Sequence, residues 1–113
     1  MPEIPFQTID WNQISRTEQA GETETSYSQT LELGTLCIRK VTYSENYTAD
    51  HWCKKEHIVH CLRGEFIIEV ENKQNNLITT GMTFVVSDDA SSHRANTTKG
   101  AELLIIDGDF LKQ

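Results

Sequence analysis

The chain lacks the features that mark nucleic-acid-binding and membrane proteins. Its 10 lysines and arginines are outnumbered by 17 acidic residues, which gives a formal net charge of -7 and leaves no basic cluster. A protein of this charge is poorly suited to bind phosphate backbones or anionic lipid surfaces. No apolar run approaches the roughly 18 residues that a membrane-spanning helix needs. We therefore expect neither nucleic acid nor a membrane as a partner.

The motifs of several common enzyme and secretion classes are also missing. The sequence contains no glycine-rich phosphate loop, no Ser-His-Asp spacing and no internal repeat. Its first residues show no basic segment followed by an apolar stretch, so we expect no secretory signal. Three cysteines are an odd number, and they form no CxxC pair. This pattern favours reduced or metal-bound thiols in the cytoplasm over disulfides.

A chain of 113 residues is expected to form a single domain. We expect residues 1–34 to form an N-terminal arm and a first strand, and residues 35–113 to form the rest of the same domain. Asp10 fits the N-cap of a short helical turn. Residues 16–28 are polar, with few apolar positions for a core, and are expected to form a surface arm with short edge pairing.

From Tyr27 onward, apolar residues recur with a period of two, the pattern of β-strands. This pattern predicts strands at residues 27–33, 35–43, 57–62, 65–71, 77–80, 82–86 and 101–107. Arg63 and Gly64 are expected to form a tight turn between two of these strands. Short strands separated by turns, with at most one helix, indicate an all-β sandwich or barrel.

All four histidines lie between residues 51 and 93, and one cysteine lies among them. Because side chains alternate along an extended chain, His51 and Cys53 are expected to point to the same side. His57 rejoins that side at the start of the next strand if residues 54–56 form the connecting turn. His93, from a distant loop, is a fourth candidate. Imidazole and thiolate are the ligands that zinc prefers, so these side chains form a candidate metal site.

The spacing of these residues resembles the two-motif pattern of the cupin superfamily. The matching residues are His51, Cys53 and His57 in the first motif, followed by Gly64, Gly81 and His93. The run from Asp50 to Cys53 is also similar to that of a group of small single-domain cupins named for a DHCW motif. The resemblance covers roughly residues 35–107. It implies a cupin-type jelly-roll β-barrel with a short helical or irregular N-terminal segment, and a homodimer.

The resemblance further implies that His51, Cys53, His57 and His93 form the metal shell. Two of these residues depart from the usual cupin pattern. Cys53 stands where a second histidine is common, and His57 stands where a carboxylate is common. Three histidines and a thiolate favour zinc as the divalent metal, ahead of iron or copper.

Cys53 separates two functional hypotheses. If its thiolate binds the metal, four protein ligands close the coordination shell, as in a structural site of a non-catalytic binding or sensing cupin. If it stands back, three histidines leave a position for water or substrate, as in a metal-dependent enzyme acting on a small molecule. A third hypothesis is a metal-free barrel whose histidines line a small pocket. The sequence alone specifies neither substrate nor reaction.

Overall fold

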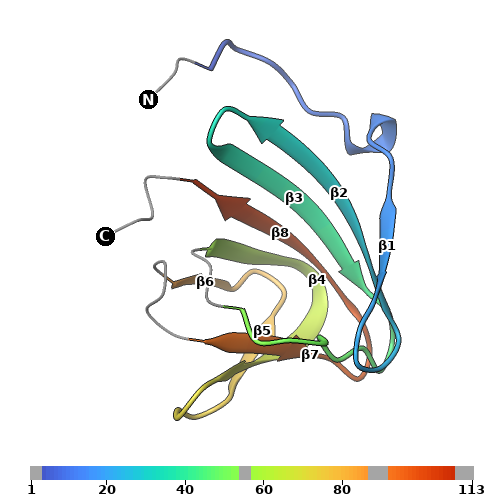
Figure 1. Cartoon of the computed structure of the whole chain (residues 1–113), viewed down its shortest axis with the longest axis vertical. Helices are drawn as coiled ribbons and strands as arrows, with labels where there is room; N and C mark the ends of the chain where they lie inside the picture. The colour runs from blue at the N-terminus through green and yellow to red at the C-terminus, as the bar shows by residue number, and fades with distance from the viewer. Residues whose placement is uncertain (1–3, 54–56, 87–91, 109–113) are drawn as a thin grey trace.

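The computed structural model describes residues 4–53, 57–86 and 92–108. These residues form one short 3-10 helix and eight strands (Figure 1). The elements are η1 (Trp11–Gln13), β1 (Thr17–Ala20), β2 (Thr25–Leu33), β3 (Leu36–Tyr43), β4 (His57–Val70), β5 (Asn76–Thr79), β6 (Thr83–Val86), β7 (His93–Asn96) and β8 (Ala101–Asp107). In the described part of the chain, no helix has the length and apolar character needed to cross a membrane.

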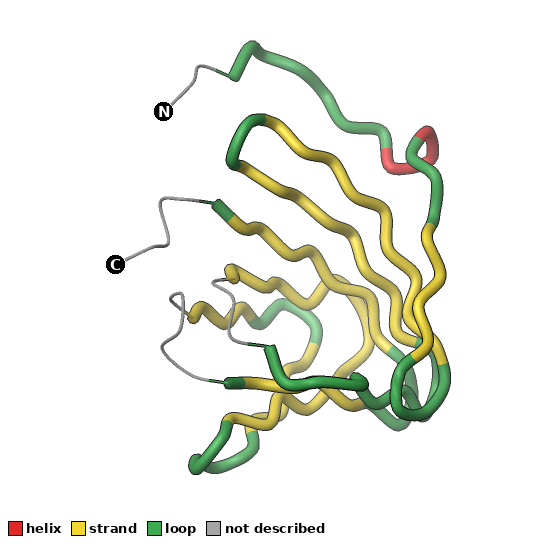
Figure 2. Tube along the Cα trace, in the orientation of Figure 1, coloured by secondary structure: helices red, strands yellow, loops and turns green. Residues whose placement is uncertain are grey.

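The strands form two antiparallel layers that curve over one another (Figure 2). One layer runs in the order β1, β2, β3, β8 and the first half of β4, with β6 on the other side of β4. The second layer consists of the second half of β4 with β5 and β7. β4 therefore belongs to both layers. The prediction of an all-β jelly-roll fold with a short helical N-terminal segment is confirmed.

The tight turn predicted at Arg63 and Gly64 is wrong. Both residues lie within β4, where the pairing with β8 shifts register between Cys61 and Arg63. The shift changes which residues face inward: His57, Val59 and Cys61 are buried before it, and Phe66 and Ile68 after it. Gly64 has a φ of +80°, which bends the strand without reversing it. A bulge and a hairpin turn both favour glycine, so the sequence pattern alone does not separate them.

β1 is the short edge pairing expected in the arm of residues 16–28, although its bounds were not predicted, and β7 has no counterpart among the predicted strands. All four residues of β1 are exposed, and β7 contains one apolar residue, Ala95, in His93–Asn96. Neither strand shows the apolar alternation on which strand prediction depends. The expected helical turn is present as η1, and the Asp10 side chain accepts a hydrogen bond from the Asn12 backbone N–H.

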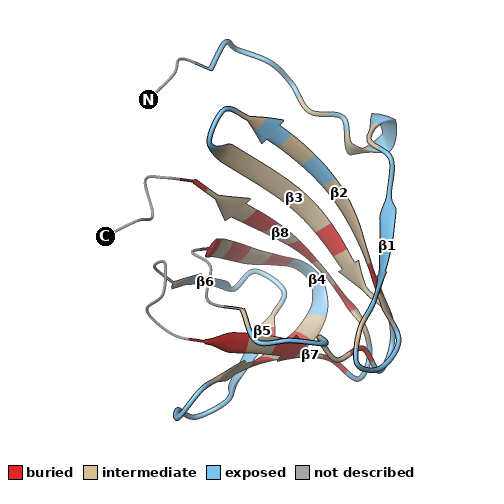
Figure 3. Cartoon of the chain, viewed as in Figure 1, coloured by how far each residue is buried: buried red, intermediate tan, exposed pale blue. Residues whose placement is uncertain are grey.

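The core lies between the two layers (Figure 3). Its buried apolar residues are Val41, Val59, Cys61, Phe66, Ile68, Ile78, Ala95, Ala101, Leu103 and Ile105. The alternation of side chains along each strand determines which residues enter the core. In β8, alternate residues are buried, and they are Ala101, Leu103 and Ile105. At the end of the barrel where β4 and β7 begin, this apolar filling gives way to buried polar residues, among them His57 and His93.

Candidate metal centre

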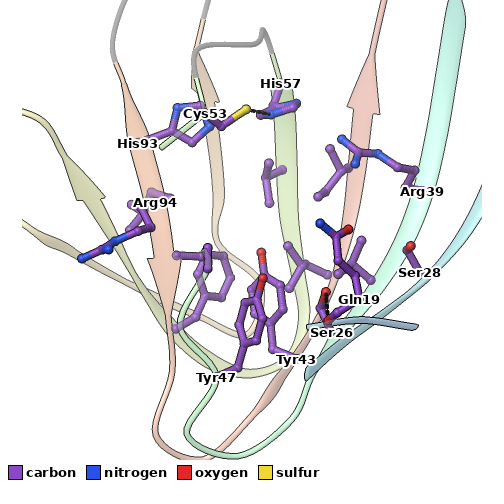
Figure 4. A pocket seen from close by; sticks show the side chains of 18 of the residues that line it. Gln19, Ser26, Ser28, Arg39, Tyr43, Tyr47, Cys53, His57, His93 and Arg94 are labelled. Atoms are coloured by element: carbon purple, nitrogen blue, oxygen red, sulfur yellow. Dashed lines mark hydrogen bonds between the residues drawn. The ribbon is translucent and has the colours of Figure 1, made fainter. Parts of the chain in front are cut away.

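Three of the four predicted ligands meet at this end of the barrel. One ligand atom from each of Cys53, His57 and His93 lies within 4.8 Å of the others. Figure 4 shows the three side chains converging over one end of a partly open cavity. Both histidines are buried, and Cys53 is half-buried. We call these three residues the Cys-His-His cluster.

Backbone pairing places Cys53 beside His93. Each of the two residues donates its backbone N–H to the other's carbonyl, at 2.8 and 2.9 Å. Two residues that exchange both hydrogen bonds in an antiparallel pair project their side chains to the same face. The position of Cys53 therefore follows from its pairing with β7. The connecting turn expected at residues 54–56 lies outside the described residues.

His51 is not part of the cluster. The segment before Cys53 pairs with β7 through a hydrogen bond from Ala49 to Ala95 and through the bonds between Cys53 and His93. Between these two contacts the segment advances four residues, whereas β7 advances only two. The extra residues form a bend at Asp50 and His51, and the expected alternation fails there. The His51 side chain is 67% exposed, and its Nδ1 lies 2.7 Å from the Asp50 carboxylate. The four-residue shell stays a prediction, and the structure brings together three of its members.

Asp107, at the end of β8, fixes the orientation of His57. Its carboxylate bonds to Nδ1 of His57 through one oxygen and to the Arg39 guanidinium, at 3.0 Å, through the other. On the other side of the ring, Nε2 of His57 lies 3.3 Å from Sγ of Cys53. Burial lowers the pKa of His57, but the hydrogen bonds to Asp107 and Cys53 outweigh it and raise the pKa to about 9. The ring therefore presents Nε2 to the cluster.

The separation of the Cys53 and His57 donor atoms fits a tetrahedral metal ion. An ion bound by a thiolate at about 2.3 Å and an imidazole at about 2.0 Å sets sulfur and nitrogen roughly 3.5 Å apart. The observed separation between Sγ of Cys53 and Nε2 of His57 is 3.3 Å. The Asp107–His57 hydrogen bond is also the contact that metal-binding histidines commonly make through their second nitrogen.

Below the cluster lies a cavity of about 170 Å³ that is partly open to the surface. Two tyrosines, Tyr43 and Tyr47, stack at its floor with ring centroids 4.5 Å apart, and their hydroxyl groups point toward the cluster (Figure 4). Burial raises the pKa of both phenols, so both remain O–H donors at neutral pH. The cavity therefore combines an apolar lower wall with hydroxyl donors that face the candidate metal position.

A second polar group on the cavity wall, Arg94, is neutralised by its neighbours. Its guanidinium contacts the Glu69 carboxylate at 3.3 Å and the Glu22 carboxylate at 3.2 Å, and it lies 5.0 Å from the centre of the Trp52 ring. The hydrogen bond from Arg94 holds the pKa of Glu69 below its usual range. Arg94 thus serves mainly to join β7 to β4.

No protein-family model and no curated protein matches this chain. Several solved structures match its fold. A predicted oxalate decarboxylase from Thermotoga maritima has a TM-score of 0.76 at 13% identity, over 90% of this chain and 99% of that one. An RmlC-like cupin from Shewanella frigidimarina has a TM-score of 0.74 at 18% identity, over 90% and 89%. Ectoine synthase from P. lautus has a TM-score of 0.70 at 20% identity, over 89% and 76%.

Proposed function

Starting from the cupin fold that these neighbours share with the chain, we propose that the protein is a metal-dependent enzyme acting on a small molecule. Cys53, His57 and His93 are the proposed metal ligands, and the cavity below them is the proposed substrate site. The observation that carries this proposal is the convergence of three donor atoms, within 4.8 Å of one another, over a cavity lined in part by polar groups.

The number of ligands favours an enzyme over a structural site. Structural zinc sites are closed by four protein ligands, whereas catalytic sites keep three and leave one position for water or substrate. Among the described residues the cluster contains three side chains, and His51, the fourth candidate, is exposed beside Asp50. The alternative of a non-catalytic sensing cupin with a closed shell therefore has less support.

Zinc is the proposed metal. One thiolate and two imidazoles form a ligand set that zinc accepts in catalytic sites and that copper also binds, and among the described residues no carboxylate joins the cluster to favour a harder ion. A bound zinc ion supplies a Lewis acid that polarises a substrate oxygen or activates water. The chain's own residues orient the reaction: Asp107 holds the His57 ring, and the hydroxyl groups of Tyr43 and Tyr47 offer hydrogen bonds to substrate from the floor of the cavity.

Metal content tests this proposal directly. We expect protein purified without added metal to contain about one zinc ion per chain by elemental analysis, because the three donors form one tetrahedral site. Cys53→Ala removes the thiolate, and we expect it to lower zinc affinity by at least about 100-fold, since ligand loss exceeds the 10- to 100-fold cost of losing an outer contact. His51→Ala is the matched control and should keep wild-type affinity.

Two results would contradict the proposed site. One is a wild-type protein that binds no divalent metal in titration. The other is a His51→Ala variant that loses as much affinity as Cys53→Ala, which would restore the closed four-ligand shell and with it the sensing alternative. Cobalt in place of zinc gives a further readout, since its absorption spectrum reports thiolate coordination.

We also propose that the protein is a homodimer. Phe6 is 94% exposed and Ile4 is 41% exposed, on an extended segment that precedes η1. Beyond that segment, β1 ends the strand order with every residue exposed. An exposed sheet edge next to exposed apolar side chains is a surface that folded proteins commonly cover.

Light scattering after size-exclusion chromatography tests the dimer. We expect twice the chain mass for the wild type and the single-chain mass for Phe6→Ser at low micromolar concentration, because the substitution removes the most exposed aromatic side chain from the proposed interface. Val85→Ser, at an exposed apolar residue on β6, is the control and should stay dimeric. A wild-type protein of single-chain mass would rule the dimer out.

A further inference from the structure

A continuous series of aromatic rings lines the cavity from its floor, at Tyr43 and Tyr47, to His93 of the Cys-His-His cluster (Figure 4). The stacked pair of tyrosines is continued by Phe66, whose ring lies edge-on to that of Tyr43 with centroids 5.9 Å apart. The Phe84 ring follows, with its centroid 6.4 Å from that of Phe66 and 6.3 Å from that of the His93 imidazole. We call these five residues the aromatic wall.

Two rings of the aromatic wall keep surface that a ligand can contact. Tyr43 and Phe84 are partly buried side chains packed against the core. Phe66 is only 1% exposed and contacts both of them, so it holds the two rings in place. Aromatic rings attract one another in edge-to-face and offset-stacked arrangements, beyond the effect of burying their area. The aromatic wall therefore favours a ligand that brings a further ring.

The charged side chains of the lining already have partners of their own. Each arginine or aspartate in the described part of the lining contacts a second titratable side chain within 3.3 Å. The pairs are Arg39 with Asp107, Arg94 with Glu69, and Asp50 with His51. Because both arginines are matched by carboxylates, neither is available as the main recognition group for an anion. Shape and ring contacts are then the features of the lining that distinguish one ligand from another.

The cavity has room for one six-membered ring. Its volume is about 170 Å³. For comparison, an apolar protein cavity of about 150 Å³ is large enough to bind benzene. Because the cavity is partly open to the surface, substituents on the ring can extend outward, and the volume sets a lower limit on the size of the ligand but no upper one.

We propose that the cavity binds a molecule with a flat ring that carries an oxygen substituent, of the kind found in aromatic alcohols and phenols. The ring packs against Tyr43 and Phe84, and the oxygen faces the Cys-His-His cluster. This inference rests on the proposed function, because the oxygen is placed at the proposed metal position. Phe84 is then the residue that selects for the ring, since it adjoins His93 of the cluster.

Titration of the zinc-loaded protein with two alcohols, followed by NMR, tests this assignment. Benzyl alcohol carries the flat ring, and cyclohexylmethanol has the same non-hydrogen atoms in a puckered ring with more apolar surface. Burial of area alone would favour cyclohexylmethanol. We expect benzyl alcohol to bind about 2- to 10-fold more tightly, the strength of one aromatic pair. Equal affinities, tighter binding of cyclohexylmethanol, or no binding of either alcohol would overturn the assignment.

Variants of the two partly buried rings connect the preference to the aromatic wall. Tyr43→Leu and Phe84→Leu each remove one ring, and we expect each to reduce the preference for benzyl alcohol by at least about twofold. Tyr43→Phe keeps the ring and should keep the preference. Tyr27→Leu is the matched control, because the Tyr27 ring contacts Arg16 at 4.3 Å and is not part of the cavity lining.

A preference that survives both leucine substitutions in the aromatic wall would overturn the assignment. Nuclear Overhauser contacts in the wild type give the same answer if either leucine variant fails to fold. Contacts between the ring protons of benzyl alcohol and those of Tyr43 and Phe84 are expected. Their absence in the saturated complex would overturn the assignment as well.

Zinc titration separates this inference from the proposed function. A protein that binds zinc but shows no preference for the flat ring would keep the proposed function and overturn this inference. If the wild-type protein binds no zinc, the proposed function fails, and the comparison of the two alcohols on metal-free protein then decides the ring site. A preference that depends on Phe84 would keep that site, and its absence would remove it.

Discussion

The zinc affinity of this protein is expected to rise by at least about tenfold per pH unit as pH increases from neutral toward about 9, because zinc binding releases the His57 proton and any proton on the Cys53 thiol. Zinc binds the neutral imidazole of His57, whereas the metal-free site keeps that ring protonated. The hydrogen bonds from Asp107 and Cys53 outweigh the effect of burial and raise the pKa to about 9. Below that pH, each zinc ion must displace a proton from His57.

The sign of this effect can be checked on the metal-free protein. A histidine whose pKa is higher in the folded than in the unfolded protein stabilises the fold at low pH. That stabilisation is complete below the unfolded value, near 6.5, and is lost as pH rises through about 9. Metal-free protein should therefore become less stable over the range in which zinc affinity increases.

Chelator competition at a series of pH values measures the effect, with the chelator's own protonation taken into account. Asp107→Asn is the matched variant, since it keeps the size of the side chain and removes the charge that raises the pKa of His57. We expect the rise in affinity to end at a lower pH in this variant. An affinity that does not change with pH in the wild type would contradict the assignment of His57 as a ligand.

Gly64→Ala is expected to destabilise the fold by about 2–5 kcal/mol, a large part of the stability of a typical domain. Gly64 has a φ of +80°, which an alanine adopts only with strain. A Cβ atom at this position would lie 2.5 Å from the carbonyl oxygen of Gly100, well inside van der Waals contact. The strand bend that joins the two layers therefore requires glycine for two reasons.

Gly81→Ala provides the control for this prediction. Gly81 has a φ of +91°, but a Cβ atom there meets no atom within 4 Å. The substitution should therefore cost the backbone strain alone, about 1 kcal/mol. Urea unfolding of both variants gives the comparison. An equal loss of stability in the two would show that contact with Gly100 does not constrain the bend.

Most of the fold was predictable because its strands carry a regular apolar alternation. β8 shows this best: alternate residues from Ala101 to Ile105 are buried, and the predicted strand ends match the observed ones. The prediction was wrong at Gly64 because the chain passes from one layer to the other there without reversing direction. The glycine at position 64 indicates that the backbone bends there, but the direction in which the next strand runs depends on long-range pairing.

The candidate site was predictable to the extent that it depends on residue type. Cys53, His57 and His93 are the residue types that bind zinc, and they converge. The placement of His51 could not be inferred, because the bend at residues 50–51 is set by pairing with β7. Asp107 was also missed, since nothing at the end of an apolar strand marks one acidic residue as the partner of a histidine 50 positions away.

The division of β4 between the two layers would make the lifetime of the folded protein depend on metal binding. His57 begins the half of β4 that pairs with β8, whereas His93 belongs to β7 in the other layer and is joined there to Cys53. An ion bound by all three would cross-link the layers at the end of the barrel opposite the Gly64 bend. Cross-links between distant points of a chain lower the entropy of its unfolded state. The lifetime of the folded molecule would then follow the local supply of metal, through the concentration dependence that links ligand binding to folding.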